Sequence, residues 1–338
     1  MKHSALEAPP WVYDRLALGS ADKYSWQDEP WHAETLHPEP CAGQPRDERP
    51  INVPIRIETR RISGPSCTLL SWRVADAVDL PAPLFEQVCE DIYRRLDRAL
   101  DEPGPKPPHN QMVRLWNFIP QILDPLGKLE HRYMVFNSGR YRALSSCLRH
   151  IEQVATASGV GHFDRDFVVH CLTTPTPGRA VENPRQIPAY RYSKRFGPHP
   201  PCFARATRLA DPDEKVRDPK TPPRWLLVGG TAAVRGEDSL FPDDFSAQLE
   251  ETLLNLAAVT RAGFQCKDPD PCPKRALATF ESLRVYLVRE QDRSILEETL
   301  RNWLDPATEI ELRHADLCRP ELLVEIEGVA DLHRLADS

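Results

Sequence analysis

The last third of the chain has the most regular pattern of hydrophobic and polar positions. Some stretches have the apolar pattern of strands, and others have apolar residues at the spacing of amphipathic helices. In chain order they are a strand at 224–234, a helix at 243–263, a strand at 281–289, a helix at 292–304 and strands at 309–317 and 321–330. This order predicts an α+β layer, one sheet with its helices on one face. Another domain or subunit must then cover the opposite face.

The final strand contains the stretch ELLVEIEG, residues 321–328, in which acids recur at every second position. Side chains alternate between the two faces of a strand. One face should therefore carry Leu322, Val324 and Ile326, and the other Leu323, Glu325 and Glu327. The alternation allows a half-buried strand whose acids face water, or a strand that holds one acid as a proton donor in a pocket. If the helices cover the apolar face, Glu325 points to the other one.

The first half shows a less regular version of the same pattern. Strands are predicted at 51–62, 67–80, 112–122 and 167–173, and a helix at 84–100. Residues 131–152 are interpreted as a strand-like aromatic stretch, a glycine turn and a helix, and ASGVGH at 157–162 as a glycine turn. The order strand, glycine turn and helix recurs at 226–263, so we hypothesise that the halves are related modules.

Three parts are expected from these patterns. They are a loop-rich N-terminal segment at 1–50, an N-terminal α+β domain at 51–180 and a C-terminal domain at 181–338. A length of 338 residues fits roughly two domains. The run at 181–208 combines prolines with tyrosines and arginines, which suits either the wall of a binding site or a structural lid.

Composition narrows the range of partners. A formal charge of -7 argues against a nucleic-acid partner, which would need a clustered excess of Lys and Arg. No apolar stretch approaches the length of a membrane span or of a signal-peptide core, so we expect a cytoplasmic protein with no membrane partner. The nine cysteines lack CxxC pairs, and nothing near Cys266 and Cys272 completes a metal-ligand set, so we expect reduced thiols and no metal.

Familiar catalytic motifs are missing. GGTAAVRG lacks the lysine and the glycine spacing of a phosphate-binding loop, and GxSxG does not occur. Three histidines, His162, His170 and His314, are candidates for acid–base work or are satisfied structural residues.

Arginines and tyrosines remain as candidate binding groups. They are Arg140, Arg142, Tyr190, Arg191, Tyr192, Arg205, Tyr286 and Arg289. Guanidinium groups bind carboxylates through paired hydrogen bonds, and each tyrosine adds a directional hydroxyl, which together suit a small dianionic substrate. The alternative is that these arginines pair with some of the 50 acidic residues at the surface.

Nine strings between Val113 and Val329 resemble the chorismatase family, whose members cleave chorismate to pyruvate and a ring product. In order they are VRLWNFIPQI, RYMVFNSGR, ASGVGH, VENPRQIPAYRY, GPHPPCFARAT, VGGTAAVRGE, QLEETLLNL, RVYLVR and CRPELLVEIEG. The resemblance implies a C-terminal catalytic domain with a fold similar to the trimeric, YjgF-like reactive-intermediate deaminases. Its active site would lie against the sheet face opposite the helices, with no metal or organic cofactor.

The resemblance also assigns residues. The family's catalytic glutamate falls on Glu325, and its substrate-binding positions fall on Tyr190, Tyr192, Arg205, Tyr286, Arg289 and Ala232. Cleavage of the enol ether of chorismate begins with protonation of its methylene carbon, which calls for a well-placed acid. Burial keeps a carboxyl protonated near neutral pH, so Glu325 is the expected acid, while Glu327 is expected to face solvent.

Family members differ in their ring product. Cys318, seven residues before Glu325, resembles the members that make 3-hydroxybenzoate, whereas Ala232 stands where those members tend to have glycine. A chorismate lyase or hydrolase of secondary metabolism that makes 3-hydroxybenzoate and pyruvate is the leading hypothesis. Alternatives are formation of 4-hydroxybenzoate as well, hydrolysis to a dihydroxycyclohexadiene carboxylate, a non-catalytic metabolite-binding protein, and an imine or enamine hydrolase. The assembly could be a monomer or a trimer.

Overall fold

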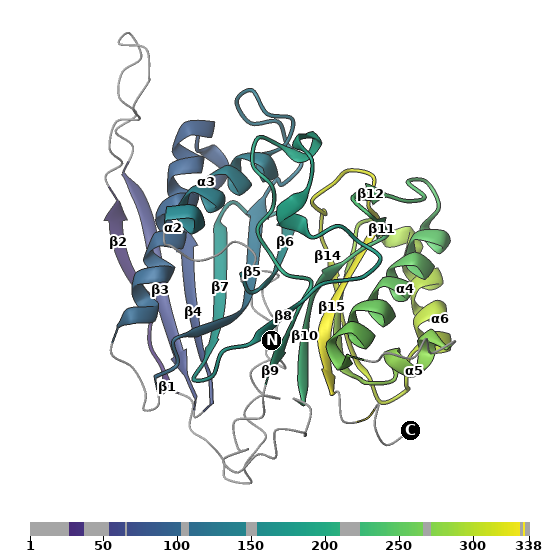
Figure 1. The fold of residues 1–338 in the computed structure, drawn as a ribbon. Coiled ribbons are helices and arrows are strands. Elements are labelled where there is room, and N and C mark those ends of the chain that lie inside the picture. Colours follow the sequence, from purple (N-terminus) through teal and green to yellow (C-terminus); the bar gives the residue numbers. More distant parts are fainter. Residues whose placement is uncertain are drawn as a thin grey trace.

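Two β-sheets, one from each half of the chain, lie side by side at the centre of the protein and share a hydrophobic cluster (Figure 1). The computed structural model describes residues 27–36, 54–64, 66–102, 108–146, 154–209, 224–265, 272–331 and 334. Most of the segment at 1–50 therefore lies outside the described residues, and so does Cys266.

The first sheet is built from the N-terminal half. Its strands are β1 (Gln27–Asp28), β2 (His32–Leu36), β3 (Ile55–Ser63), β4 (Thr68–Val74), β5 (Gln111–Pro120), β6 (Thr156–His162) and β7 (Phe167–Thr174). They lie in the order β1-β3-β4-β7-β5-β6, with β2 also paired to β3. Two long helices, α2 (Ala82–Asp101) and α3 (Arg132–Ser146), pack on its outer face.

The second sheet is built from the C-terminal half. Its strands are β8 (Arg179–Val181), β9 (Ala206–Leu209), β10 (Trp225–Thr231), β13 (Phe280–Leu287), β14 (Glu309–His314) and β15 (Val324–Asp331), in the order β14-β13-β15-β10-β9-β8. The helices α4 (Phe245–Phe264), α5 (Pro273–Leu277) and α6 (Arg293–Trp303) cover its outer face. The strands β11 (Val234–Arg235) and β12 (Asp238–Ser239) form a small separate hairpin.

Both halves repeat one β-β-α-β-α-β-β unit. The strand order β3-β4-β7-β5-β6 of the first unit matches β9-β10-β15-β13-β14 of the second. In each unit the strands on either side of the second helix pair in parallel, and the other neighbours pair antiparallel. The hypothesis of related modules is confirmed at the level of topology. The segments that suggested it are not equivalent, however, because α3 corresponds to α6 and β10 corresponds to β4.

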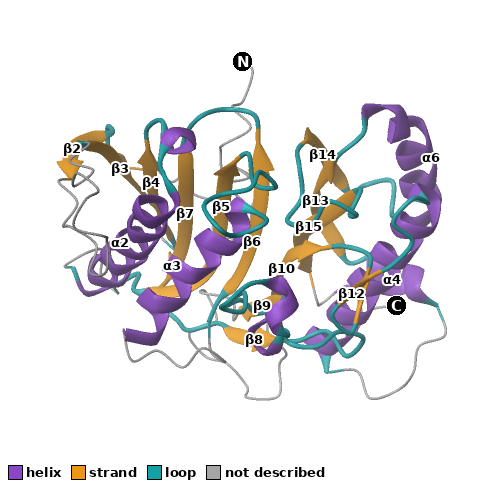
Figure 2. Cartoon of the chain, turned by 90° about the horizontal axis from the view of Figure 1, so that it is seen from above, coloured by secondary structure: helices purple, strands orange, loops and turns teal. Residues whose placement is uncertain are grey.

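Seen from above, the helices of each half lie on one side of their own sheet (Figure 2). Three hydrophobic clusters hold these layers together. One lies between the first sheet and its helices, and another between the second sheet and its helices. The third joins side chains of both sheets, among them Trp116 and Phe118 from β5, and Leu227 and Val329 from β10 and β15. The expectation that another part of the protein covers the free face of the second sheet is therefore confirmed.

The sequence interpretation was wrong at two glycine-containing segments. Residues 132–146 form one continuous helix, α3, and not a strand-like stretch with a turn. This helix is buried on nearly all sides, so it lacks the polar face that would have revealed a helical period. Residues 157–162 belong to strand β6 and not to a turn. The glycine at 159 is explained by packing, because a Cβ there would lie 2.9 Å from the ring of Tyr133.

The start of the last strand was also placed incorrectly. Strand β15 begins at Val324, after a turn in which the Leu322 amide donates to the Arg319 carbonyl at 3.2 Å. Leu323 therefore packs with Ile326 on the helix side, and Leu322 packs in the cluster between the sheets, so these two leucines lie on the faces opposite to those predicted. From Val324 onward the side chains alternate as expected.

Among the described residues, no helix combines the length and apolar character needed to cross a membrane.

Gly139 tests the close contact between α2 and α3. A Cβ at this position would lie 2.3 Å from the Glu86 carbonyl oxygen, so Gly139→Ala should push the helices apart and lower the free energy of unfolding by about 2 kcal/mol. Urea denaturation measures this change. The exposed helical control Ser145→Ala should stay within about 0.5 kcal/mol of wild type, and equal effects of the two changes would contradict the packing argument.

Candidate active site

A cavity of about 400 Å³ opens where the first sheet meets the second. Its walls come from the start of α3, from β6, from the loop at 186–205, from β10 and from residues 318–325. Both halves of the chain contribute, so neither unit forms this cavity alone. Five residues that the resemblance singled out line it: Glu325, Cys318, Tyr192, Arg205 and Ala232.

Glu325 lies at the second position of β15, and only 5% of its surface is exposed. Its carboxyl group lies against Gly230 of β10, where a Cβ would be 1.9 Å from Glu325 Oε1. Only glycine leaves room for the acid here. A glycine in the strand predicted at 224–234 thus makes the space that Glu325 occupies.

Burial raises the pKa of Glu325 to about 8, and the nearby charge of Glu327 adds to this rise. The guanidinium groups of Arg114, Arg205 and Arg319 oppose it. Desolvation has the largest effect because the carboxyl has almost no contact with water. Glu325 therefore keeps its proton at neutral pH and can donate it.

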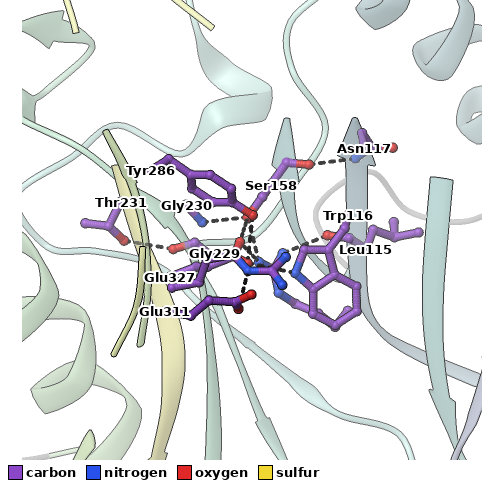
Figure 3. A network of polar contacts seen from close by, with 12 residues as sticks. Leu115, Trp116, Asn117, Ser158, Gly229, Gly230, Thr231, Tyr286, Glu311 and Glu327 are labelled. Carbon is purple, nitrogen blue, oxygen red and sulfur yellow. Dashed lines mark hydrogen bonds and ion pairs between the residues drawn. The ribbon is translucent and has the colours of Figure 1, made fainter. Parts of the chain in front are cut away.

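Glu327 does not face solvent, so that expectation was wrong. Its side chain is 1% exposed and accepts hydrogen bonds from Arg114 Nη2 at 2.6 Å and from Trp116 Nε1 and Tyr286 Oη at 3.0 Å each (Figure 3). Ser158 Oγ donates to the same carboxylate. Alternation placed both acids on one face correctly, but that face is covered by the first sheet.

Two guanidinium groups line the cavity without a carboxylate partner among the described residues. Arg205 donates to the Tyr192 hydroxyl at 2.6 Å and to the Ile187 carbonyl at 3.1 Å. Arg319 donates to the Glu237 carbonyl at 2.8 Å, and its guanidinium carbon lies 4.0 Å from the centre of the Phe196 ring. Protein dipoles and aromatic faces hold both cations, which leaves their charge available to an anionic ligand.

Cys318 and Tyr133 add two neutral groups to the cavity. Burial and the neighbouring Glu325 raise the pKa of Cys318 to about 12, so its sulfur remains a thiol. Burial, followed by the proximity of Cys318, also raises the pKa of Tyr133. Near neutral pH both groups are protonated hydrogen-bond donors beside Glu325.

Two residues that line the cavity, Arg319 and Tyr133, were not among the candidates predicted from the sequence. Arg319 follows Cys318 directly, so its place beside a proposed site residue was a usable signal. Tyr133 gave none, because its segment was interpreted as a strand.

Other candidates lie outside the cavity wall. Tyr286 points to Glu327, and Arg289 donates to Asp292 Oδ2 at 2.7 Å. The Tyr190 ring centre lies 5.5 Å from the guanidinium carbon of Arg191.

The three candidate histidines also lie outside the cavity wall. His162 is buried at the end of β6, His170 is hydrogen-bonded to Ser71 at 2.7 Å, and His314 is hydrogen-bonded to the Val288 carbonyl at 2.9 Å. Arg140 is buried on α3, and Arg142 pairs with Glu86 at 3.0 Å.

No cluster of three or more His, Cys, Asp or Glu side chains suited to a metal ion occurs in the part of the chain that the structure describes.

The raised pKa of Glu325 makes a prediction about stability. As the pH rises from about 4.5 to about 8, the unfolded chain ionises this carboxyl while the folded protein keeps its proton, so folding loses free energy over this window. Glu325→Gln removes this loss. The variant's gain in free energy of unfolding over wild type should increase by about 3 kcal/mol from pH 5 to pH 8.

Urea denaturation at the two pH values measures this gain. Glu250→Gln, at an exposed position of α4, is the matched control and should give the same difference at both. A gain for Glu325→Gln that does not change with pH would show that the carboxyl is not protonated in the folded state.

Comparison with known proteins identifies relatives of this chain. Residues 68–173 match the family described as chorismatase FkbO/Hyg5-like, N-terminal. A 3-hydroxybenzoate synthase of Streptomyces hygroscopicus is 30% identical over 250 residues, which cover 74% of this chain and 71% of that protein.

Solved structures agree on the fold. A chorismatase crystal structure covers 80% of this chain and 77% of its own, with a TM-score of 0.68 and 23% identity, which confirms the α+β fold class. RidA from an Antarctic Psychrobacter matches 45% of this chain and 98% of its own, with 16% identity and a TM-score of 0.32. The YjgF-like likeness thus extends over part of the chain, at a score that carries no argument about function. On the identity and coverage of the Streptomyces relative, this chain belongs to the chorismatase family.

Proposed function

We propose that this protein is a chorismatase that converts chorismate to 3-hydroxybenzoate and pyruvate, with Glu325 as general acid. The observation that carries the proposal is a protonated, buried carboxyl in a cavity that also holds two cations with no carboxylate partner among the described residues. The relative named 3-hydroxybenzoate synthase supports the choice of substrate and product.

The cavity suits a dianion that must be protonated on carbon. Chorismate carries two carboxylates, which Arg205 and Arg319 would hold through charge-assisted hydrogen bonds. Both arginines are already fixed by backbone carbonyls and aromatic rings, so little side-chain entropy is lost on binding. Tyr192 takes part indirectly, because its hydroxyl accepts from Arg205.

In the proposed reaction, Glu325 donates its proton to the methylene carbon of the enolpyruvyl group. The electron pair of the double bond forms the new C–H bond, and an oxocarbenium ion results. The newly ionised Glu325 carboxylate stabilises that cation in a site with little water. The ring hydroxyl then attacks the cation to close a cyclic ketal, and its proton returns to the Glu325 carboxylate. The bond between the ring carbon and this hydroxyl oxygen breaks while the neighbouring ring carbon, which bears the ether oxygen, loses its hydrogen as a proton, so the ring becomes aromatic. The remaining hemiketal collapses to pyruvate, and the ether oxygen stays on the ring, takes up that proton and becomes the hydroxyl of 3-hydroxybenzoate.

Cys318 and Ala232 are the residues proposed to influence which nucleophile captures the cation. Both line the cavity that contains Glu325. A neutral thiol is larger and less polar than water, so Cys318 would exclude water from the cation and favour the ring hydroxyl. The methyl group of Ala232 takes up space that glycine would leave open.

We also propose the domain division 51–180 and 181–338. Sheet membership supports it, because β3 to β7 form one sheet and β8 to β15 the other, apart from the β11–β12 hairpin. In this division the proposed acid comes from the C-terminal domain, and the N-terminal domain closes the cavity.

Purified protein incubated with chorismate should release pyruvate, and Glu325→Gln should lower kcat by about 10²-fold or more, because the amide cannot donate the proton. A coupled pyruvate assay measures both rates. The rate of the wild type should also fall as the pH rises through about 8, where Glu325 ionises. Wild-type protein that releases no pyruvate at high concentration would falsify the proposal.

Replacing the thiol tests product control. Cys318→Ala should keep chorismate consumption but move product away from 3-hydroxybenzoate toward the dihydroxycyclohexadiene carboxylate, because the smaller side chain admits water. Chromatography of the ring products measures the ratio. Cys272→Ala, at an exposed position outside the cavity, is the control and should leave the ratio unchanged. If both variants give the wild-type ratio, Cys318 has no part in product choice.

A further inference from the structure

A group of charged side chains is buried between the two sheets behind Glu325 (Figure 3). Arg114 of β5 is 2% exposed, and Glu327 of β15 is 1% exposed. Arg284 of β13 lies beside them and pairs with Glu311 of β14 at 2.7 Å. Glu325 is two residues from Glu327 on the same face of β15, so two buried carboxyl groups lie near one cation, Arg114.

The chemistry of the site requires these two carboxyl groups to differ. A cation within about 4–6 Å of a carboxyl lowers its pKa by about 1–3 units. If Arg114 paired with Glu325, that acid would ionise and lose the proton it is proposed to donate. Arg114 must therefore be kept from Glu325.

Hydrogen bonds commit Arg114 to the other acid. Its Nη2 donates to Glu327 Oε2 and to Ser158 Oγ, each at 2.6 Å, and its Nη1 donates to the Leu115 carbonyl at 2.7 Å. The ring of Trp116 lies 4.7 Å from its guanidinium carbon. The guanidinium is thus fixed on several sides.

Hydrogen-bond donors surround the carboxyl group of Glu327. Its two oxygens accept from four donors: Arg114, Trp116, Ser158 and Tyr286. A protonated carboxyl would turn one of these acceptors into a donor and break the set. Ser158 Oγ also accepts from the amide of Gly230, the residue against which Glu325 lies, so the same network fixes the position of the acid.

We propose that Glu327 is a positioning residue that binds Arg114 and thereby leaves Glu325 in its proton-donating form. The meaning of that proton for turnover rests on the proposed function, whereas the protonation of Glu325 itself does not. The other charged or titratable groups that act on Glu325 are Arg205 from the cavity loop, Arg319 and Cys318 from the segment before β15, and Tyr133 from α3.

Glu327→Gln tests the proposal. The variant keeps the shape of the side chain but leaves Arg114 without an anion, and it also removes the Glu327 charge that raises the pKa of Glu325. Both changes should lower the pKa of Glu325, and the double variant described below isolates the part due to Arg114. The titration of Glu325 can be followed by ¹³C NMR of protein labelled at the glutamate side-chain carboxyls, with the Glu325 signal assigned from its loss in Glu325→Gln. The midpoint should fall by at least about one pH unit.

The activity readout should move with the titration. The alkaline limb of the kcat/KM profile for chorismate should shift to lower pH by the same amount, while the rate at low pH is largely retained. A role limited to holding the fold would lower the rate at every pH without moving the limb.

Two further variants make the test specific. Arg114→Gln combined with Glu327→Gln removes both charges, and paired removal of a buried ion pair is tolerated better than removal of one partner. Its Glu325 midpoint should return to within about half a unit of wild type. Trp116→Phe removes one hydrogen bond from Glu327 but keeps both charges, so it should leave the midpoint in place.

Each outcome decides the matter. A midpoint in Glu327→Gln equal to that of wild type overturns the proposal. If that variant does not fold, a double variant whose midpoint differs from wild type by more than about one unit overturns it as well. A lowered midpoint in Glu327→Gln, together with a wild-type protein that releases no pyruvate from chorismate, supports the role of Glu327 and refutes the proposed function, so the two failures are distinguishable.

Discussion

The packing of the two sheets against each other is the constraint on which the rest of the structure depends. Each sheet has its helices on the outer face, and side chains from the other faces of both sheets share one hydrophobic cluster. That contact excludes water from Arg114 and Glu327 and from the back of the cavity. Without this burial Glu325 would have the pKa of an ordinary surface carboxyl, and the arginines would be screened by solvent.

The two units share one topology but differ at the positions that matter chemically. Counted from the first residue of the equivalent strands, Val168 of β7 corresponds to Glu325 of β15, and His170 corresponds to Glu327. Val168 packs in the cluster between the sheets, and His170 is hydrogen-bonded to Ser71. At these two positions the first unit carries no acid, so the paired acids come from the second unit alone.

The arrangement around Glu325 sacrifices stability for a protonated acid. A buried carboxyl costs free energy at the pH where the unfolded chain would ionise it, and Gly230 gives up the packing of a side chain to make room. The extensive core on both sides of each sheet supplies the stability that this site lacks. In the part of the chain that the structure describes, Arg205 and Arg319 have no carboxylate partner, which is consistent with a cavity arranged around a ligand and not around its own salt bridges.

The sequence by itself determined the α+β layers of the C-terminal half, the amphipathic helices α2, α4 and α6, and the fact that Glu325 and Glu327 share one face. These features depend on local periodicity, which neighbouring residues define. Only the tertiary structure decided that α3 is a helix, that ASGVGH is a strand, and that Glu327 is buried on Arg114. These depend on contacts between residues far apart in the chain, and an alternating pattern cannot distinguish a face open to water from one covered by a second sheet.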